Sequence, residues 1–331
     1  MSVGRKQRTQ PRLGGRAAWL GLGLAGMVGL LSSSSLLAAE AGATPEVLPA
    51  VKQRTFKTPE EAAEALIVAA ERFDIPTLQE ILGPDGVDLV VTADAVMDRN
   101  QSLAFAAEAR AQHAVARDPE KPKLAVMSVG NEDWPLPIPL VEKRGQWLFD
   151  TKAGRREVLY RRIGTNELNA IDICRGYVEA QHEYASRKHD GAYVNQYAQR
   201  VVSTPGKQDG LAWRAADGTW QGPVGEGIAR VIAEGYSDRY EAYHGYYFKV
   251  LKAQGPAAPL GEMDFVVNGA MLGGFALVAA PADYKVTGVK TFIVSHEGVV
   301  YEKDLGPKSV EKFRALERYN PESSWTPVEE P

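Results

Sequence analysis

The spacing of apolar residues changes from helical to alternating twice along this chain, and this double change restricts the folds open to it. In the first half, the predicted helices and then strands are 59–70, 76–82, 98–116, 123–129, 138–142 and 146–149. In the second half they are helices at 166–189, 193–202 and 225–236, then strands at 246–253, 274–280, 289–295 and 299–303. Because short turns such as Lys143-Arg144-Gly145 join strands into hairpins, both halves are predicted to be α+β with antiparallel sheets.

Local signals set the expected boundaries. Thr58 precedes Pro59 and Glu61 in the pattern of a helix N-cap with a capping box. The expected organisation is a disordered lead-in, an N-terminal domain, a linker, a C-terminal domain and a Pro-rich tail, at 44–54, 55–153, 154–164, 165–320 and 321–331. The linker is basic, and its arginines are expected to pair with acidic neighbours; an anion site is the alternative.

The first 43 residues have the layout of a secretory signal peptide. Five basic residues precede an apolar run from Ala17 to Leu31, and small residues follow up to Ala43. The run is shorter than the roughly 20 residues that span a bilayer, so cleavage is expected; an uncleaved anchor is the alternative. We therefore expect a periplasmic or secreted protein with no membrane span after cleavage.

Charge and cysteine content narrow the partners and the chemistry. The leader holds five of the 38 basic and one of the 42 acidic residues, so the remainder has 33 basic and 41 acidic side chains and a net charge of −8. An acidic protein repels nucleic acid, which is not expected as a partner. The single cysteine, Cys174, excludes an intrachain disulfide and is expected to be a buried, inert thiol.

Two architectural resemblances follow from the element order. Helices followed by a sheet that ends in Gly145-Gln146-Trp147-Leu148-Phe149-Asp150 resemble the nuclear-transport-factor-2-like fold. Residues 166–304, a long helix and then a meandering sheet, resemble the head of type IV pilins and pseudopilins. A pilin head continues directly from its own apolar N-terminal helix, whereas about 100 residues intervene here. The resemblance therefore implies sideways docking at most, not entry into a filament core.

A further resemblance covers the chain from about Phe56 to Pro327. The segments that carry it are 57–60, Glu132-Asp133-Trp134-Pro135-Leu136-Pro137-Ile138-Pro139, 203–207, Tyr243-His244-Gly245-Tyr246-Tyr247-Phe248, 273–277 and 300–307. These strings are similar to a family of exported bacterial proteins known only as a domain of unknown function. The resemblance implies no activity.

No catalytic constellation stands out. Glu179, His182 and Glu183 share a helix face, but a di-metal site of that kind needs a second copy on a neighbouring helix. Ser295 and His296 are neighbours on a strand, so their side chains diverge. Paired carboxylates for glycoside hydrolysis stay open. We predict no catalytic residue, no metal site and no cofactor.

The feature that most favours binding is a cluster of aromatic residues with polar tips. The candidate binding surface consists of Trp213, Trp220, Tyr236, Tyr240, Tyr243 and His244. The alternative is that these side chains cover the core. The sequence thus predicts a non-enzymatic binding or assembly factor of the cell envelope, with an envelope protein or a cell-wall component as its partner. A hydrolase acting on cell-wall glycan or peptide is the alternative.

Overall fold

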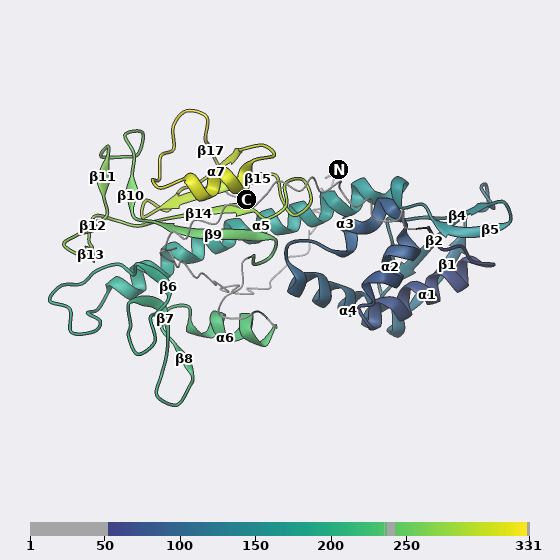
Figure 1. Cartoon of the computed structure of the whole chain (residues 1–331), viewed down its shortest axis with the longest axis horizontal. Helices are drawn as coiled ribbons and strands as arrows, with labels where there is room; N and C mark the ends of the chain where they lie inside the picture. The colour runs from purple at the N-terminus through teal and green to yellow at the C-terminus, as the bar shows by residue number, and fades with distance from the viewer. Residues whose placement is uncertain (1–51, 235, 237–241, 330–331) are drawn as a thin grey trace, which may run out of the picture.

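The computed structural model describes residues 52–234, 236 and 242–329. The predicted signal peptide and most of the predicted lead-in lie outside this range. The two halves of the chain lie end to end, and the long helix α5 (Thr151–Ala185) runs from one into the other (Figure 1). The α+β class with antiparallel sheets is confirmed.

The N-terminal half packs helices against a curved antiparallel sheet. Its elements are α1 (Pro59–Glu71), α2 (Ile75–Leu82), η1 (Pro84–Gly86), α3 (Val87–Val90), α4 (Ala95–Ala111), β1 (His113–Arg117), β2 (Leu124–Val129), β3 (Trp134–Pro135), β4 (Leu140–Lys143) and β5 (Gln146–Phe149). The strand order is β1-β2-β4-β5, with β3 paired to β2. The predicted cap is confirmed, because the backbone N–H of Glu61 donates to Thr58 Oγ1 at 3.1 Å.

The described end of the predicted lead-in is packed onto this half. Gln53 Nε2 donates to the carbonyl oxygens of Ile81 and Phe149 at 3.1 and 2.8 Å, and the backbone N–H of Arg54 donates to Glu80 O at 2.8 Å. Disorder was therefore the wrong expectation for residues 52–54, because their polar groups find partners on α2 and β5.

The predicted helix at 98–116 ends early. Residues 113–117 form β1, in which His113 pairs with Val129 and Arg117 with Ala125. The alanines of this segment suit a helix by propensity, but pairing with β2 overrides that preference.

The segment predicted as a linker, 154–164, is part of the continuous helix α5. Asp150 caps its start, with Oδ1 accepting from the N–H of Ala153 at 3.4 Å. A Cβ built on Gly154 would lie 2.3 Å from Pro137 O and 2.6 Å from the Cα of Ile138. The absence of a side chain at Gly154 thus lets α5 lie directly on the 137–138 backbone.

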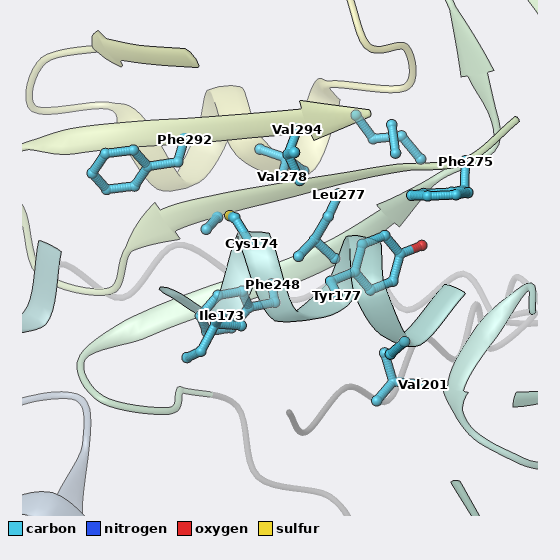
Figure 2. Close-up of a cluster of buried hydrophobic side chains, with 14 of the residues drawn as sticks. Ile173, Cys174, Tyr177, Val201, Phe248, Phe275, Leu277, Val278, Phe292 and Val294 are labelled. Atoms are coloured by element: carbon cyan, nitrogen blue, oxygen red, sulfur yellow. The ribbon is translucent and has the colours of Figure 1, made fainter. Parts of the chain in front are cut away.

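The C-terminal half places α5 against a five-stranded antiparallel sheet. Its other elements are β6 (Arg200–Val202), β7 (Gly210–Arg214), β8 (Trp220–Gln221), α6 (Gly225–Ala233), β9 (Tyr246–Leu251), β10 (Ala253–Gln254), β11 (Met263–Asp264), β12 (Val266–Val267), β13 (Ala270–Met271), β14 (Ala276–Pro281), β15 (Lys290–Ser295), β16 (Val300–Asp304), α7 (Ser309–Ala315) and β17 (Thr326–Pro327). The main sheet has the order β17-β16-β15-β14-β9. In Figure 2, Cys174 and Tyr177 of α5 lie beside Leu277 of β14, and all three side chains are fully buried.

Two predictions of local structure fail between α5 and α6. Residues 193–202 form no helix: the backbone N–H of Tyr197 donates to Met271 O at 2.9 Å, and the segment ends in β6, which pairs in parallel with β7. The stretch 206–223, which has no regular element in the prediction, contains β7 and β8. The first error arises because the partner of Tyr197 lies far along the chain. The second arises because β7 and β8 are short strands.

The predicted tail at 321–331 is part of the fold as far as it is described. Thr326 and Pro327 pair with Glu302 and Tyr301 at the edge of the main sheet, and Trp325 is buried. Glu322 and Lys303 form an ion pair of 2.9 Å beside them. The end of the chain therefore contributes an edge strand.

This attachment predicts a specific pH dependence. Hydrogen bonds from Lys303 and Ser324 lower the pKa of Glu322 to about 2. Because the folded-state pKa lies below that of the unfolded chain, the stabilisation is complete above about pH 4.5 and is lost as the pH falls towards about 2. We expect Glu322→Gln to lower the melting temperature at about pH 6 and to have no effect near pH 2, measured against the unchanged protein at each pH. A difference that is constant with pH would contradict this assignment.

Candidate functional site

A buried carboxylate joins the two halves. Asp94, the N-cap of α4, is only 2 % exposed. The hydroxyl of Tyr236 donates to its two oxygens at 2.8 and 2.9 Å, and the backbone N–H of Gly245 donates to Oδ2 at 3.1 Å. The N–H of Met97 donates to Oδ1 at 2.9 Å. We call these four residues the Asp94 cluster.

Further polar contacts surround the Asp94 cluster. Asn100 Nδ2 donates to Glu234 O at 2.9 Å, and the backbone N–H of Ala93 donates to Asp283 Oδ2 at 2.8 Å. Both bonds connect residues more than 130 positions apart, one from each half. Val96 adds an apolar contact with the C-terminal core. The contact between the halves is thus largely polar.

The aromatic residues around Asp94 are stacked edge to face. The ring centroids of Tyr236 and Tyr243 are 5.1 Å apart, and those of Tyr243 and His244 are 4.2 Å apart. Burial, followed by the nearby Asp94, raises the pKa of Tyr236, and burial raises that of Tyr243. Burial also lowers the pKa of His244, with Asp94 opposing the shift.

The chemical capacity of this site lies in His244. Its backbone is in the left-handed region with φ +48°, and its side chain is half-buried. Strained backbone of this kind persists where the surroundings hold it in place. A lowered pKa keeps the imidazole neutral at neutral pH, so that it can both donate and accept a hydrogen bond. The oxygens of Asp94 accept four hydrogen bonds from three donors within the protein, the Tyr236 hydroxyl and the N–H groups of Gly245 and Met97, which suits a structural role.

The structure divides the six predicted surface residues between two places. Tyr236, Tyr243 and His244 meet at the Asp94 cluster, whereas Trp213 and Trp220 lie on β7 and β8. Tyr240 lies outside the described residues. Tyr236, Tyr243 and Trp213 are buried, at 3–8 % exposure, so a partner cannot reach them in this conformation. A binding role for the half-buried Trp220 and His244 stays a prediction.

Trp213 and Trp220 each contact neighbouring side chains. The ring of Trp213 lies 5.5 Å from that of His189, which stacks on Tyr184 at 3.9 Å. The guanidinium of Arg214 lies 4.9 Å from the ring of Trp220. Trp213 is therefore a core residue, and the interpretation that these aromatics cover the core holds for it.

Three arginines of the segment 154–164 bind groups within the protein. Arg155 pairs with the carboxylate of Asp88, and Arg162 donates to the carbonyl oxygens of Asp88 and Leu89 at 2.9 and 2.7 Å. Arg161 pairs with Glu157 at 2.8 Å. The prediction that these arginines pair with acidic neighbours is confirmed for Arg155 and Arg161.

A tryptophan outside the predicted set is the most exposed one that the structure describes. Trp134 is 54 % exposed, and the guanidinium of Arg161 lies 5.1 Å from its ring. The segment that carries Trp134 lies against α5, because the backbone of Pro137 and Ile138 contacts Gly154. From the sequence, Asp133-Trp134-Pro135 and the prolines after it predict a rigid, extended connection that packs against the sheet, with a recognition surface as the alternative. In the structure Trp134 pairs with Val129 of β2.

The described residues give no support for a reactive thiol or for a metal site. Burial raises the pKa of Cys174 to about 12, so its thiol stays protonated and unreactive at neutral pH. Within residues 52–234, 236 and 242–329, no three His, Cys, Asp or Glu side chains are grouped so that they could bind a metal ion. Over the same ranges, no helix has both the length and the apolar character needed to cross a membrane.

Asp94 was missed by sequence analysis. A Thr-Ala-Asp string before a helix indicates an N-cap, but the bonds from Tyr236 and Gly245 come from 142 and 151 residues away. No spacing in the sequence carries that information.

Comparison with protein families gives a match over most of the chain. The model of a family described as a protein of unknown function (DUF2950) matches residues 53–328. No curated protein and no solved structure matches the chain.

Proposed function

This chain belongs to the DUF2950 family of proteins of unknown function, and on that premise we propose that it is exported to the bacterial cell envelope and acts there as a non-enzymatic binding or assembly factor. The order of basic, apolar and small residues at the N-terminus supports export. The long helix packed on an antiparallel sheet agrees with a pilin-like docking unit, a likeness that stays a prediction.

One observation carries the binding role: Trp134 is presented to solvent on a rigid frame. Its strand pairs with β2, its ring is covered on one side by Arg161, and its segment is fixed against α5 at Gly154. Tryptophan and arginine are the residue types most enriched at the energetic centre of protein interfaces. Tyr160, the residue before Arg161 on the same helix, is 63 % exposed.

The test is capture with the chain from residue 44 to 331 as bait, using crosslinked envelope fractions that include digested cell wall. We expect a reproducible partner whose binding weakens at least about 30-fold in Trp134→Ala, the effect of losing roughly 2 kcal/mol at an interface centre. Trp134→Phe should retain part of it. Leu260→Ala, another exposed apolar side chain in the C-terminal half, is the matched control.

Two results would overturn the proposal. Unchanged capture by Trp134→Ala would remove this surface from the interaction. New wall fragments that appear with the intact bait and vanish after one acidic substitution would favour the alternative, a hydrolase of cell-wall glycan or peptide.

A further inference from the structure

One edge of the N-terminal sheet is open. This sheet lies at the end of the molecule away from the C-terminal half (Figure 1). Its first strand, β1, has β2 on one side and no described strand on the other. All residues of β1 are exposed except Val115, which is half-buried. The opposite edge is closed from within, because Phe56 and Trp147 of β5 exchange two backbone hydrogen bonds of 2.8 Å.

The hydrogen-bond pattern shows which backbone groups of β1 face outwards. At the two ends of its pairing with β2, the N–H of Gly130 donates to Gln112 O and the N–H of Asp118 donates to Leu124 O, each at 2.9 Å. Because such bonds alternate along an antiparallel pair, the even-numbered residues of β1 bond to β2. The odd-numbered residues, 113, 115 and 117, therefore turn their N–H and C=O groups to the open side.

These outward groups have no backbone partner among the described residues. They extend over about 14 Å at the spacing of a sheet, so they can pair with one kind of ligand, the backbone of another extended polypeptide. Edge strands are commonly protected by lysine, proline or a bulge. The sequence of β1, His113-Ala114-Val115-Ala116-Arg117, and its unbroken register with β2 provide none of these.

The side chains of β1 define which segment fits. Val115 packs against the apolar clusters of the N-terminal half, so an apolar residue opposite it would extend the core. Arg117 forms no ion pair with a described residue, and its guanidinium lies 5.2 Å from the ring of Trp147. Between Glu108 and Asp118 the chain has no acidic residue. Charge complementarity therefore favours an acidic residue beside Arg117.

The open edge is close to Trp134. His113 of β1 and Trp134 of β3 pair with the same residue, Val129 of β2, from its two sides. A strand added to β1 would lie three strand spacings from β3, about 14 Å. A partner seated on Trp134 is thus within reach of β1.

We propose that β1 binds an extended segment of the partner protein as an added strand, with an apolar residue opposite Val115 and an acidic residue beside Arg117. This role rests on the binding function proposed above and defines the chemistry of the partner. A second copy of this chain fits less well. Pairing two β1 strands about Val115 sets Arg117 of one copy opposite His113 of the other, with no carboxylate in either strand.

The experiment is an NMR titration of residues 44–331 with a synthetic peptide blocked at both ends, Thr-Glu-Thr-Val-Thr-Val-Thr. We expect the amide protons of His113, Val115 and Arg117 to exchange rapidly with solvent in the free protein and to become protected when the peptide binds. The amide protons of Ala114 and Ala116 should be protected in both states, because these residues bond to β2.

A protein variant and a modified peptide test the backbone bonds separately. Val115→Pro removes an outward N–H without removing a bond to β2 and should weaken peptide binding at least about tenfold. Val115→Thr alters the same side chain and keeps the N–H, so it is the matched control and should retain binding. N-methylation of the peptide at its Glu and Val residues should abolish binding to the unchanged protein, whereas N-methylation at the Thr residues between them should not.

The charge preference is tested on the same peptide. Replacing its Glu by Lys should weaken binding about threefold, the effect expected of one exposed ion pair. Arg117→Gln should remove this difference between the two peptides. Equal binding of both peptides to the unchanged protein would contradict the acidic character of the partner segment.

Unchanged exchange of the three outward amides at millimolar peptide, or peptide binding that Val115→Pro leaves unchanged, would overturn the added strand. Sedimentation that shows a dimer of the protein, converted to a monomer by Val115→Pro, would identify the occupant as a second copy and overturn the partner assignment. Capture that depends on Trp134 but not on Val115→Pro would leave the proposed binding function standing while the added strand fails. Capture lost in Val115→Pro and intact in Trp134→Ala would be the reverse case.

Discussion

Replacing Asp94 by alanine is expected to lower the free energy of unfolding by about 4 kcal/mol. The substitution removes the N-cap of α4 and leaves the buried Tyr236 hydroxyl and the Gly245 N–H without their acceptor. Each unsatisfied buried donor costs about 1–3 kcal/mol, and a lost cap about 1 kcal/mol. Urea unfolding, followed by circular dichroism, measures the change.

Two controls separate the parts of this effect. Tyr236→Phe removes one hydrogen-bond donor and leaves Asp94 in place as the N-cap of α4. We therefore expect the free energy of unfolding to fall by about 1–2 kcal/mol. Asp74→Ala removes the N-cap of α2, where the N–H of Thr77 donates to Asp74 at 3.2 Å. This substitution does not affect the contact between the halves. A loss as large for Asp74→Ala as for Asp94→Ala would show that capping alone matters.

The second large effect is expected at Gly154. In Gly154→Ala the new methyl group would meet the Pro137 carbonyl oxygen at 2.3 Å, a backbone contact that no side-chain rotation relieves. Overpacking of this kind costs about 1–3 kcal/mol, and Gly154→Leu should exceed that range. The same urea titration measures both variants.

The same helix supplies the opposite case. A Cβ on Gly164 would have nothing within 4 Å, so Gly164→Ala should raise the free energy of unfolding by about 0.5–1 kcal/mol through helix propensity alone. If both alanine variants were stabilising, α5 would not lie on the 137–138 backbone. A destabilising Gly164→Ala would instead show that this part of α5 is not helical in solution.

What sequence could predict here depends on how far each signal reaches along the chain. The cap at Thr58 and the turn at Lys143-Arg144-Gly145 involve neighbours, and the structure has both. β1 and β17 depend on partners that sequence spacing does not reveal, and local propensity alone misassigned them. For the same reason, the α+β class was predictable while the place of the last strand was not.

The candidate site shows the same division. The aromatic cluster was found by composition, but its exposure depends on what packs over Tyr236 and Tyr243, which sequence does not state. The arginines between the halves were correctly expected to have acidic partners, although a run with Gly154 and Gly164 suggested a linker. This segment is a helix because it makes buried contacts with both halves of the protein.

The continuous course of α5 has a consequence for how the protein can vary over generations. Its contact with the N-terminal half at Gly154 and its first buried contact in the C-terminal half, from Asn166 Nδ2 to Thr287 O, are about 18 Å apart along the axis. A loop between domains can gain or lose residues freely. Here, one inserted residue would turn the second half by about 100° relative to the first and part Asp94 from Tyr236. Inherited variants of this stretch should therefore differ by substitution and keep its length.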